Sequence, residues 1–161
     1  PKPNKSARGG ERGLARPEEE HIFPVRVYYE DTDAGGVVYY ANYLRFAERA
    51  RTEMLRRLGI ESSSLMAKEG IVFAVRHCAV DYRRPARLDD QLEVRTRMRG
   101  VGGATLEMEQ RIVRAENGSE AVRIVLTLAC MTTAGKPARI PAEIRRRLAG
   151  QRLQDINDTE R

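Results

Sequence analysis

Hydrophobic side chains recur along the chain with two different periods, and the first of them predicts a long helix. Between Asn42 and Leu58 the apolar residues stand three or four positions apart while charged residues fill the other faces, as in an amphipathic helix. Gly59 supplies the stop. The positions expected to be buried are Phe46, Ala47, Ala50, Met54, Leu55 and Leu58. A short second helix, capped by serines, is predicted over residues 62–68.

The second period is two, and it predicts strands. Residues 21–30 form one expected strand, and residues 71–133 follow strand patterns almost throughout. In the first strand the residues expected to face inward are Val25, Val27 and Tyr29. Asn117-Gly118 predicts a two-residue hairpin turn. The strand after it, over residues 122–131, is apolar on both faces and should therefore be central in the sheet.

These elements, followed by a terminal helix over residues 142–149, give the order strand, long helix and four more strands. That order predicts the α+β class, with an antiparallel sheet wrapped around one long central helix. One face of such a sheet carries no helix and must meet solvent or a second subunit. The 161 residues suit one domain over residues 21–148, with flexible tails expected at 1–20 and 149–161.

Composition limits the cellular location and the binding partners that can be expected for this protein. The net charge of +6 belongs to residues 21–150, which suits a polyanionic ligand such as a phosphorylated cofactor or a nucleic acid, or a plain solvated surface. With 6% aromatic residues and no Trp, base-stacking platforms are hard to build, so we expect no nucleic acid partner. No apolar run is long enough to span a bilayer and no secretory leader is visible, so a cytoplasmic protein is expected. Two Cys and two His without ligand spacing predict no metal site.

The candidate chemistry lies between the first strand and the long helix. Asp31 and Asp33 precede Gly35 and Gly36, and the chain enters the helix within seven residues of Asp33. A helix start presents unpaired N–H groups and partial positive charge, so a carboxylate there stands beside an oxyanion receptor. That pairing suits acyl transfer, in which Asp33 attacks a carbonyl or activates water. The same residue types also form ordinary turns and caps.

This run resembles the signature of a known family. The segment YYEDTDAGGVVYYANYLRFAERARTEMLRRLG is similar to that of the hotdog-fold acyl-CoA thioesterases, in the 4-hydroxybenzoyl-CoA and Tol-Pal-associated branch. The segments VDYRRPARLDDQLEV, GGATLEMEQRI and KPARIP follow in the order that the family shows. The likeness covers about residues 21–148, and a motif of this length is far more specific than a short pattern.

The resemblance implies a hotdog subunit that dimerises edge to edge and assembles further into a homotetramer. It places the catalytic carboxylate on Asp33 and the N–H that polarises the thioester carbonyl on Tyr40. Tol-Pal-associated members usually have His where this chain has Tyr40, so an acid-base role for that His is absent here. The implied substrate is an acyl-CoA, and no cofactor is expected.

Further residues are candidates for substrate binding. Gly36 allows close approach of a ligand, and Val38 and Tyr39 belong to an apolar run too short for a core strand, which suits a pocket wall. Phe46 and Met66 are further candidates for the pocket lining. The basic candidates for the CoA phosphates are Arg97, Arg99, Lys136 and Arg139. Neither the acyl group nor the choice between Asp33 and water as attacking group follows from the sequence.

Other residues of catalytic type favour structural roles. Cys78 and Cys130 lie in apolar strands and are expected to be buried and inert. His77 is expected to be structural, and Glu48 to be solvated or ion-paired rather than to orient Asp33. A hotdog dehydratase would need a His at the helix start, and none occurs there, which favours hydrolysis. The alternative function is a non-catalytic acyl-thioester-binding accessory of an envelope or lipid assembly.

Overall fold

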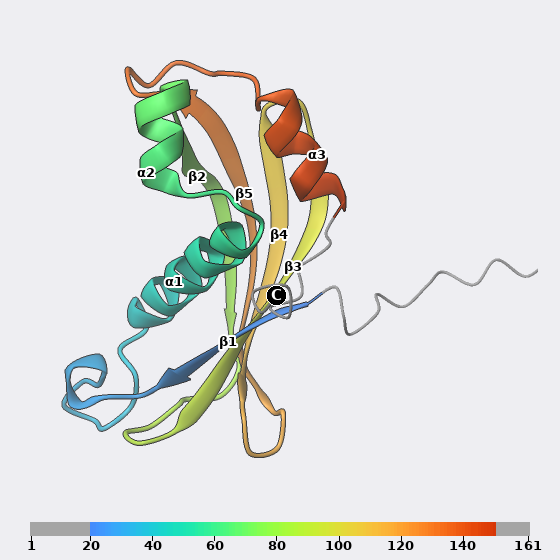
Figure 1. Cartoon of the computed structure of the whole chain (residues 1–161). Helices are drawn as coiled ribbons and strands as arrows, with labels where there is room; N and C mark the ends of the chain where they lie inside the picture. Colours follow the sequence, from blue (N-terminus) through green and yellow to red (C-terminus); the bar gives the residue numbers. More distant parts are fainter. Residues whose placement is uncertain (1–19, 151–161) are drawn as a thin grey trace, which may run out of the picture.

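The computed structural model describes residues 20–150 and shows a five-stranded antiparallel sheet wrapped around helix α1 (Figure 1). The strand order is β1-β3-β4-β5-β2. The strands are β1 His21–Arg26, β2 Ile71–Tyr82, β3 Gln91–Val101, β4 Thr105–Arg114 and β5 Glu120–Thr132. The helical elements are η2 Tyr29–Asp31, α1 Asn42–Arg57, α2 Ser62–Ser64, η3 Leu65–Glu69 and α3 Ala142–Gly150. The predicted α+β fold with one long central helix is confirmed.

Helix α1 buries its apolar stripe against the concave face of the sheet. Each of the six positions predicted from the helical period is less than 9% exposed, and Ala47 and Ala50 are fully buried. Side chains from three strands, among them Val94, Met108 and Ile124, are fully buried in the same core. Burial of this stripe, rather than helix propensity alone, stabilises α1 in its place.

The first strand is shorter than the alternation predicts. It ends at Arg26, and residues 29–31 form the 3-10 turn η2 instead of continuing it. The turn is held by the Asp31 carboxylate, which accepts a hydrogen bond from Tyr28 N–H at 2.8 Å. Tyr29 therefore does not face inward but is 83% exposed.

Two further predictions of local structure are wrong in detail. The connection between β4 and β5 spans residues 115–119 rather than two residues, and it is closed by hydrogen bonds from Arg114 N–H to Ser119 O and from Ser119 N–H to the Asn117 side chain. The predicted serine cap is absent from α2, because Glu61 occupies the N-cap position and its side chain accepts no capping bond. Strand β5 lies between β4 and β2, so it has a neighbour on each side as predicted, although β4 is the middle strand.

The outer face of the sheet, opposite α1, is charged. Glu109 is 6% exposed there and lies within 4.0 Å of three guanidinium groups, at 3.0 Å from Arg123, 3.6 Å from Arg97 and 3.8 Å from Arg99.

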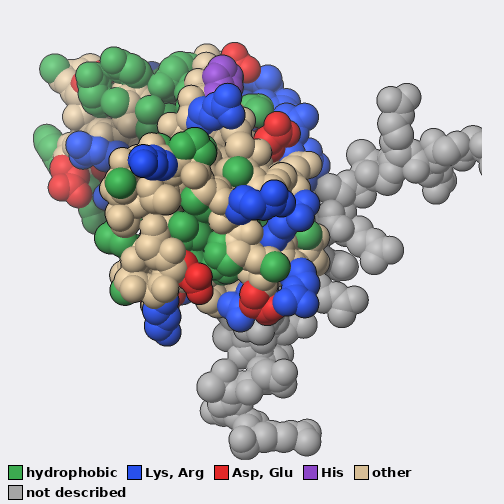
Figure 2. Space-filling model, turned by 90° about the horizontal axis from the view of Figure 1, so that it is seen from above, with side chains coloured by type: hydrophobic (Ala, Val, Ile, Leu, Met, Phe, Trp, Pro, Cys, Tyr) green, Lys and Arg blue, Asp and Glu red, His purple; other side chains and the backbone are tan. Residues whose placement is uncertain are grey.

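Viewed from above, Lys and Arg side chains are interspersed with acidic and apolar ones (Figure 2). The positive charge in this view is therefore distributed rather than gathered into one stripe.

The predicted tails lie outside the described residues, apart from Glu20 at one end and Ala149 and Gly150 at the other. Ala149 and Gly150 belong to α3. No helix within residues 20–150 is long and apolar enough to cross a membrane.

Candidate active site

The loop between η2 and α1 is folded back on itself by backbone hydrogen bonds. Thr32 and Val38 form an antiparallel bridge, and Asp33 N–H donates to Val37 O at 2.9 Å. The carbonyl of Asp31 accepts from Tyr39 N–H at 3.0 Å and from the Asn42 side chain at 2.9 Å. Through its carboxylate on η2 and its carbonyl at the start of α1, Asp31 holds the loop together.

Asp33 is exposed, whereas Asp31 is half-buried, and each carboxylate accepts one hydrogen bond among the described residues. Its Oδ1 accepts from Gly35 N–H at 2.8 Å, and no donor among the described residues bonds its other oxygen. A Cβ atom at position 35 would lie 3.1 Å from that Oδ1, so glycine there makes room for the bond. Gly36 has φ +77°, a conformation that side chains rarely adopt, and it turns the chain at the loop tip. The loop thus orients Asp33 and leaves one oxygen open.

The start of α1 has backbone N–H groups without an acceptor among the described residues. Within residues 20–150 no acceptor is bonded to the N–H of Tyr40 or Ala41, while Asn42 N–H already donates to Tyr39 O at 2.8 Å. The Tyr82 hydroxyl donates to Tyr40 O at 3.1 Å and ties this end of α1 to the end of β2. Partial burial raises the pKa of Tyr82, which keeps the hydroxyl protonated as a donor. Two open N–H groups at a helix start can receive negative charge.

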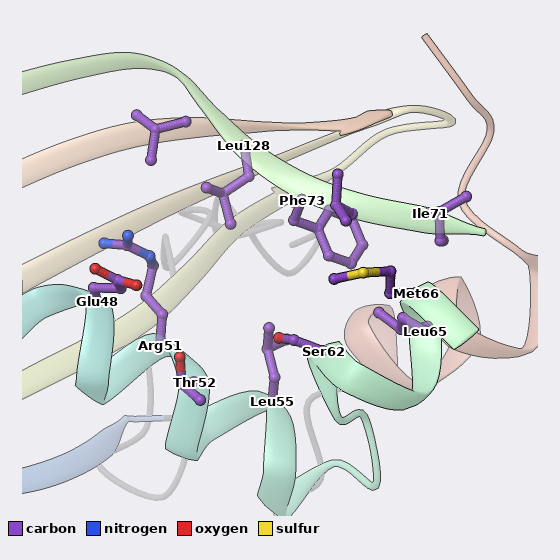
Figure 3. A pocket seen from close by; sticks show the side chains of 12 residues that line it. Glu48, Arg51, Thr52, Leu55, Ser62, Leu65, Met66, Ile71, Phe73 and Leu128 are labelled. Atoms are coloured by element: carbon purple, nitrogen blue, oxygen red, sulfur yellow. The ribbon is translucent and has the colours of Figure 1, made fainter. Parts of the chain in front are cut away.

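A cavity of about 340 Å³ lies between α1 and the edge strand β2 (Figure 3). Its apolar lining comes from α1, η3, β2 and β5, and its charged residues are Glu48 and Arg51 of α1. The apolar lining residues are Leu55, Leu65, Met66, Ile71, Val72, Phe73, Val75 and Leu128. Met66 was predicted to line a pocket and does so, whereas Val38, Tyr39 and Phe46 do not line this cavity.

The other predicted binding residues are dispersed. Val38 is 4% exposed and donates to Ala86 O at 2.8 Å, so it holds the loop against the core. Tyr39 is exposed and meets the Tyr40 ring edge to face at 4.9 Å. Arg97 and Arg99 lie on the outer face beside Glu109, away from the loop, and Arg139 and Lys136 lie in the exposed segment after β5.

The structure corrects one prediction about cysteine and finds polar residues that the sequence patterns did not single out. Cys78 is exposed, because β2 is an edge strand, whereas Cys130 is buried as predicted. Gln110 is fully buried beneath α1 and bonds Arg51 at the cavity wall. The strand alternation could have identified Gln110 as an inward-facing residue, because it stands two residues after Met108 and four after Leu106 on the same face of β4. Within residues 20–150 no three metal-ligating side chains come together.

Comparison with known proteins identifies the family of this chain. The thioesterase-like superfamily matches residues 27–148. The chain is 50% identical over 122 residues to the acyl-CoA thioester hydrolase YbgC of Escherichia coli O6:H1, covering 76% of this chain and 90% of that protein. It is 47% identical over 124 residues to the acyl-CoA thioesterase YbgC of Haemophilus influenzae, with the same coverages.

A solved structure shows the same fold at high identity. The probable thioesterase from Bartonella henselae is 42% identical to this chain, with a TM-score of 0.72, and the match covers 76% of this chain and 99% of that one. The chain therefore belongs to the thioesterase-like superfamily and is a thioester hydrolase with the hotdog fold.

Proposed function

We propose that this protein hydrolyses acyl-CoA thioesters with Asp33 and the Tyr40 N–H as its catalytic groups. The observation that carries the proposal is that one hydrogen-bonded loop holds a carboxylate with an open oxygen and ends in unengaged N–H groups at the start of α1. The relatives named as acyl-CoA thioesterases support the substrate, and they favour an enzyme over a non-catalytic binding protein.

In the proposed reaction the thioester carbonyl oxygen accepts a hydrogen bond from Tyr40 N–H, which stabilises the negative charge of the tetrahedral intermediate. Asp33 then acts in one of two ways. As a general base it takes a proton from water, and the resulting hydroxide attacks the carbonyl carbon and expels the CoA thiolate. As a nucleophile it attacks that carbon itself, expels the thiolate and leaves a mixed anhydride that water cleaves.

We also propose that the active form is a homodimer paired through β2, and that dimers assemble into a homotetramer. Strand β2 has 12 residues, lies at the sheet edge and borders the open side of the cavity. Val75 in this strand is 51% exposed beside the cavity. A second copy of β2 would pair the free strand edge, cover Val75 and close the cavity.

For the CoA phosphates we propose contacts from Arg97, Arg99 and Arg139. Among these, Arg139 is the most available, because it is exposed and no carboxylate of the described residues lies within 4.0 Å of it. Arg97 and Arg99 would have to share their charge between Glu109 and a phosphate.

Hydrolysis of short aliphatic, long aliphatic and aromatic acyl-CoAs by wild type and Asp33→Asn tests the assignment. Wild type should release CoA from at least one class, and Asp33→Asn should bind that substrate without turning it over. Label in the Asp33 carboxylate after a single turnover in ¹⁸O-water identifies the nucleophilic route, because water then cleaves the anhydride at the Asp33 carbonyl. Turnover retained by Asp33→Asn would refute the catalytic assignment.

A further inference from the structure

A chain of polar side chains crosses the core beneath α1. Gln110 Nε2 donates to Thr96 Oγ1 at 3.0 Å and to Ala47 O at 2.9 Å, and Gln110 Oε1 accepts from Arg51 Nη1 at 3.0 Å. Gln110 and Thr96 are fully buried. Apolar side chains would fill these positions without the cost of burying polar groups. These hydrogen bonds hold the Arg51 guanidinium at one place in the cavity wall.

Arg51 has more donors than its partners use. A guanidinium carries five N–H donors, and within residues 20–150 its only hydrogen bond is the one to Gln110. No carboxylate of those residues lies within 4.0 Å of it, although Glu48 on the preceding turn acts on it through its charge. Burial lowers the pKa of Arg51, so the charged group is poorly solvated where it stands. Such a group is stabilised by an acceptor brought into the cavity.

The neighbour on the same wall selects the kind of acceptor. Glu48 and Arg51 lie side by side at one end of the cavity, and apolar side chains such as Phe73 and Leu65 occupy the other end (Figure 3). A hydroxyl can accept from Arg51 and donate to Glu48. A carboxylate would meet the negative charge of Glu48, and a hydrocarbon would leave the spare N–H groups of Arg51 without an acceptor.

Two paths through the fold give the distance of this pair from the proposed oxyanion donor. Along α1, Arg51 is ten residues beyond Ala41, or about 15 Å at the helical rise. Along β2, the charge of Arg51 acts on Cys78, which is four residues, or about 13 Å, from Tyr82 and its bond to Tyr40. Both backbone spans place Arg51 well away from the start of α1, where the proposed oxyanion donor lies.

Building on the proposed function, we infer that the substrate is an acyl chain with a hydroxyl group roughly 13–15 Å from its thioester carbonyl, and that Arg51 recognises this hydroxyl. Arg51 is then a specificity-determining residue and Gln110 its positioning residue. Neither acts on the thioester itself.

The test compares kcat/KM for ω-hydroxyacyl-CoA and n-acyl-CoA substrates of equal length across a series of chain lengths. At the length that brings the hydroxyl to Arg51, wild type should prefer the hydroxylated substrate by about tenfold or more. Arg51→Met should remove this preference. Arg49→Met should keep it, because Arg49 is exposed on the same helix and does not line the cavity. Arg51→Gln is the second variant if Arg51→Met folds poorly, and it should lower the preference.

The ratio of the two substrates within one variant is independent of the fraction of folded protein, so a stability loss does not imitate the effect. Equal rates on both substrates at every length, or a preference that survives in Arg51→Met, would overturn the inference. An Arg51-dependent preference for ω-carboxyl chains would overturn the choice of a hydroxyl. Absence of hydrolysis of any acyl-CoA by wild type would instead overturn the proposed function.

Discussion

Polar groups at the start of α1 and on the outer face of the sheet differ in how fully they are bonded within the protein. On the outer face the Glu109 carboxylate is almost fully buried, and three guanidinium groups surround it. In the loop that leads into α1, one oxygen of Asp33 has no hydrogen-bond partner among the described residues. The N–H groups of Tyr40 and Ala41 have none either. Asp33 and Tyr40 are exposed, so water can satisfy these groups in the free protein and a ligand that displaces the water can bond them.

This contrast predicts that Asp33→Asn changes activity and hardly changes stability. Loss of a general base or nucleophile should lower kcat by about a thousandfold. Asn can still accept the hydrogen bond from Gly35 N–H, so the loop should stay folded. Steady-state kinetics on the preferred acyl-CoA and a thermal melt of the same sample measure both quantities. A melting temperature that drops together with kcat would show that Asp33 mainly holds the loop.

His21 sharpens the comparison because it is an unsatisfied polar group outside the site. It is 2% exposed on β1, its Nδ1 has no hydrogen-bond partner in the structure, and burial, with Arg57 adding to it, lowers its pKa from 6.5 to about 4. Below pH 6.5 the unfolded chain gains a proton that the folded chain does not. The free energy of unfolding should therefore fall by about 3 kcal/mol as pH drops from 6.5 to 4.

Urea unfolding across this pH range measures the effect. His21→Leu should flatten the pH dependence between 4 and 6.5. Equal slopes in wild type and His21→Leu would mean that other groups cause the acid sensitivity.

Glu109→Gln is the reverse of the Asp33 variant, because it should change stability and not kcat. Without the carboxylate, Arg97, Arg99 and Arg123 repel one another, but their partial exposure screens the repulsion. We expect the free energy of unfolding to fall by about 1–2 kcal/mol. Chemical denaturation and kcat are the measurements. A lower KM for acyl-CoA in this variant would support phosphate contacts by Arg97 and Arg99, whereas a lower kcat would contradict the separation of the two regions.

The elements and residues that were predictable from the sequence are those whose pattern is local. The stripe of α1 from Phe46 to Leu58 depends only on which face of one helix is apolar, and all six predicted positions are buried. The loop from Asp31 to Tyr40 could be recognised because its carboxylates, glycines and helix start are contiguous. In both regions the sequence neighbours are also the neighbours in space.

The features that sequence analysis missed depend on strand order. Nothing in residues 71–82 shows that this strand is an edge, so the exposure of Cys78 and the cavity beside it could not be foreseen. The bond between Arg51 and Gln110 joins residues 59 positions apart and forms only once β4 lies beneath α1. Tyr29 was misplaced for a local reason, because the Asp31 cap ends the strand before the alternation does.

The smallest effect is expected at Ala41, where a proline decides which open N–H is the oxyanion donor. Ala41 has φ −73°, which proline adopts without strain, and its N–H bonds no described acceptor. If Tyr40 N–H is the donor, Ala41→Pro should keep kcat/KM within about threefold, and Tyr40→Phe, which keeps that N–H, should do the same. If Ala41 N–H were the donor, its removal should cost about a hundredfold or more. Because proline restricts the backbone of the residue before it, a melting temperature equal to that of wild type is needed to assign a large loss to the missing donor rather than to a displaced Tyr40.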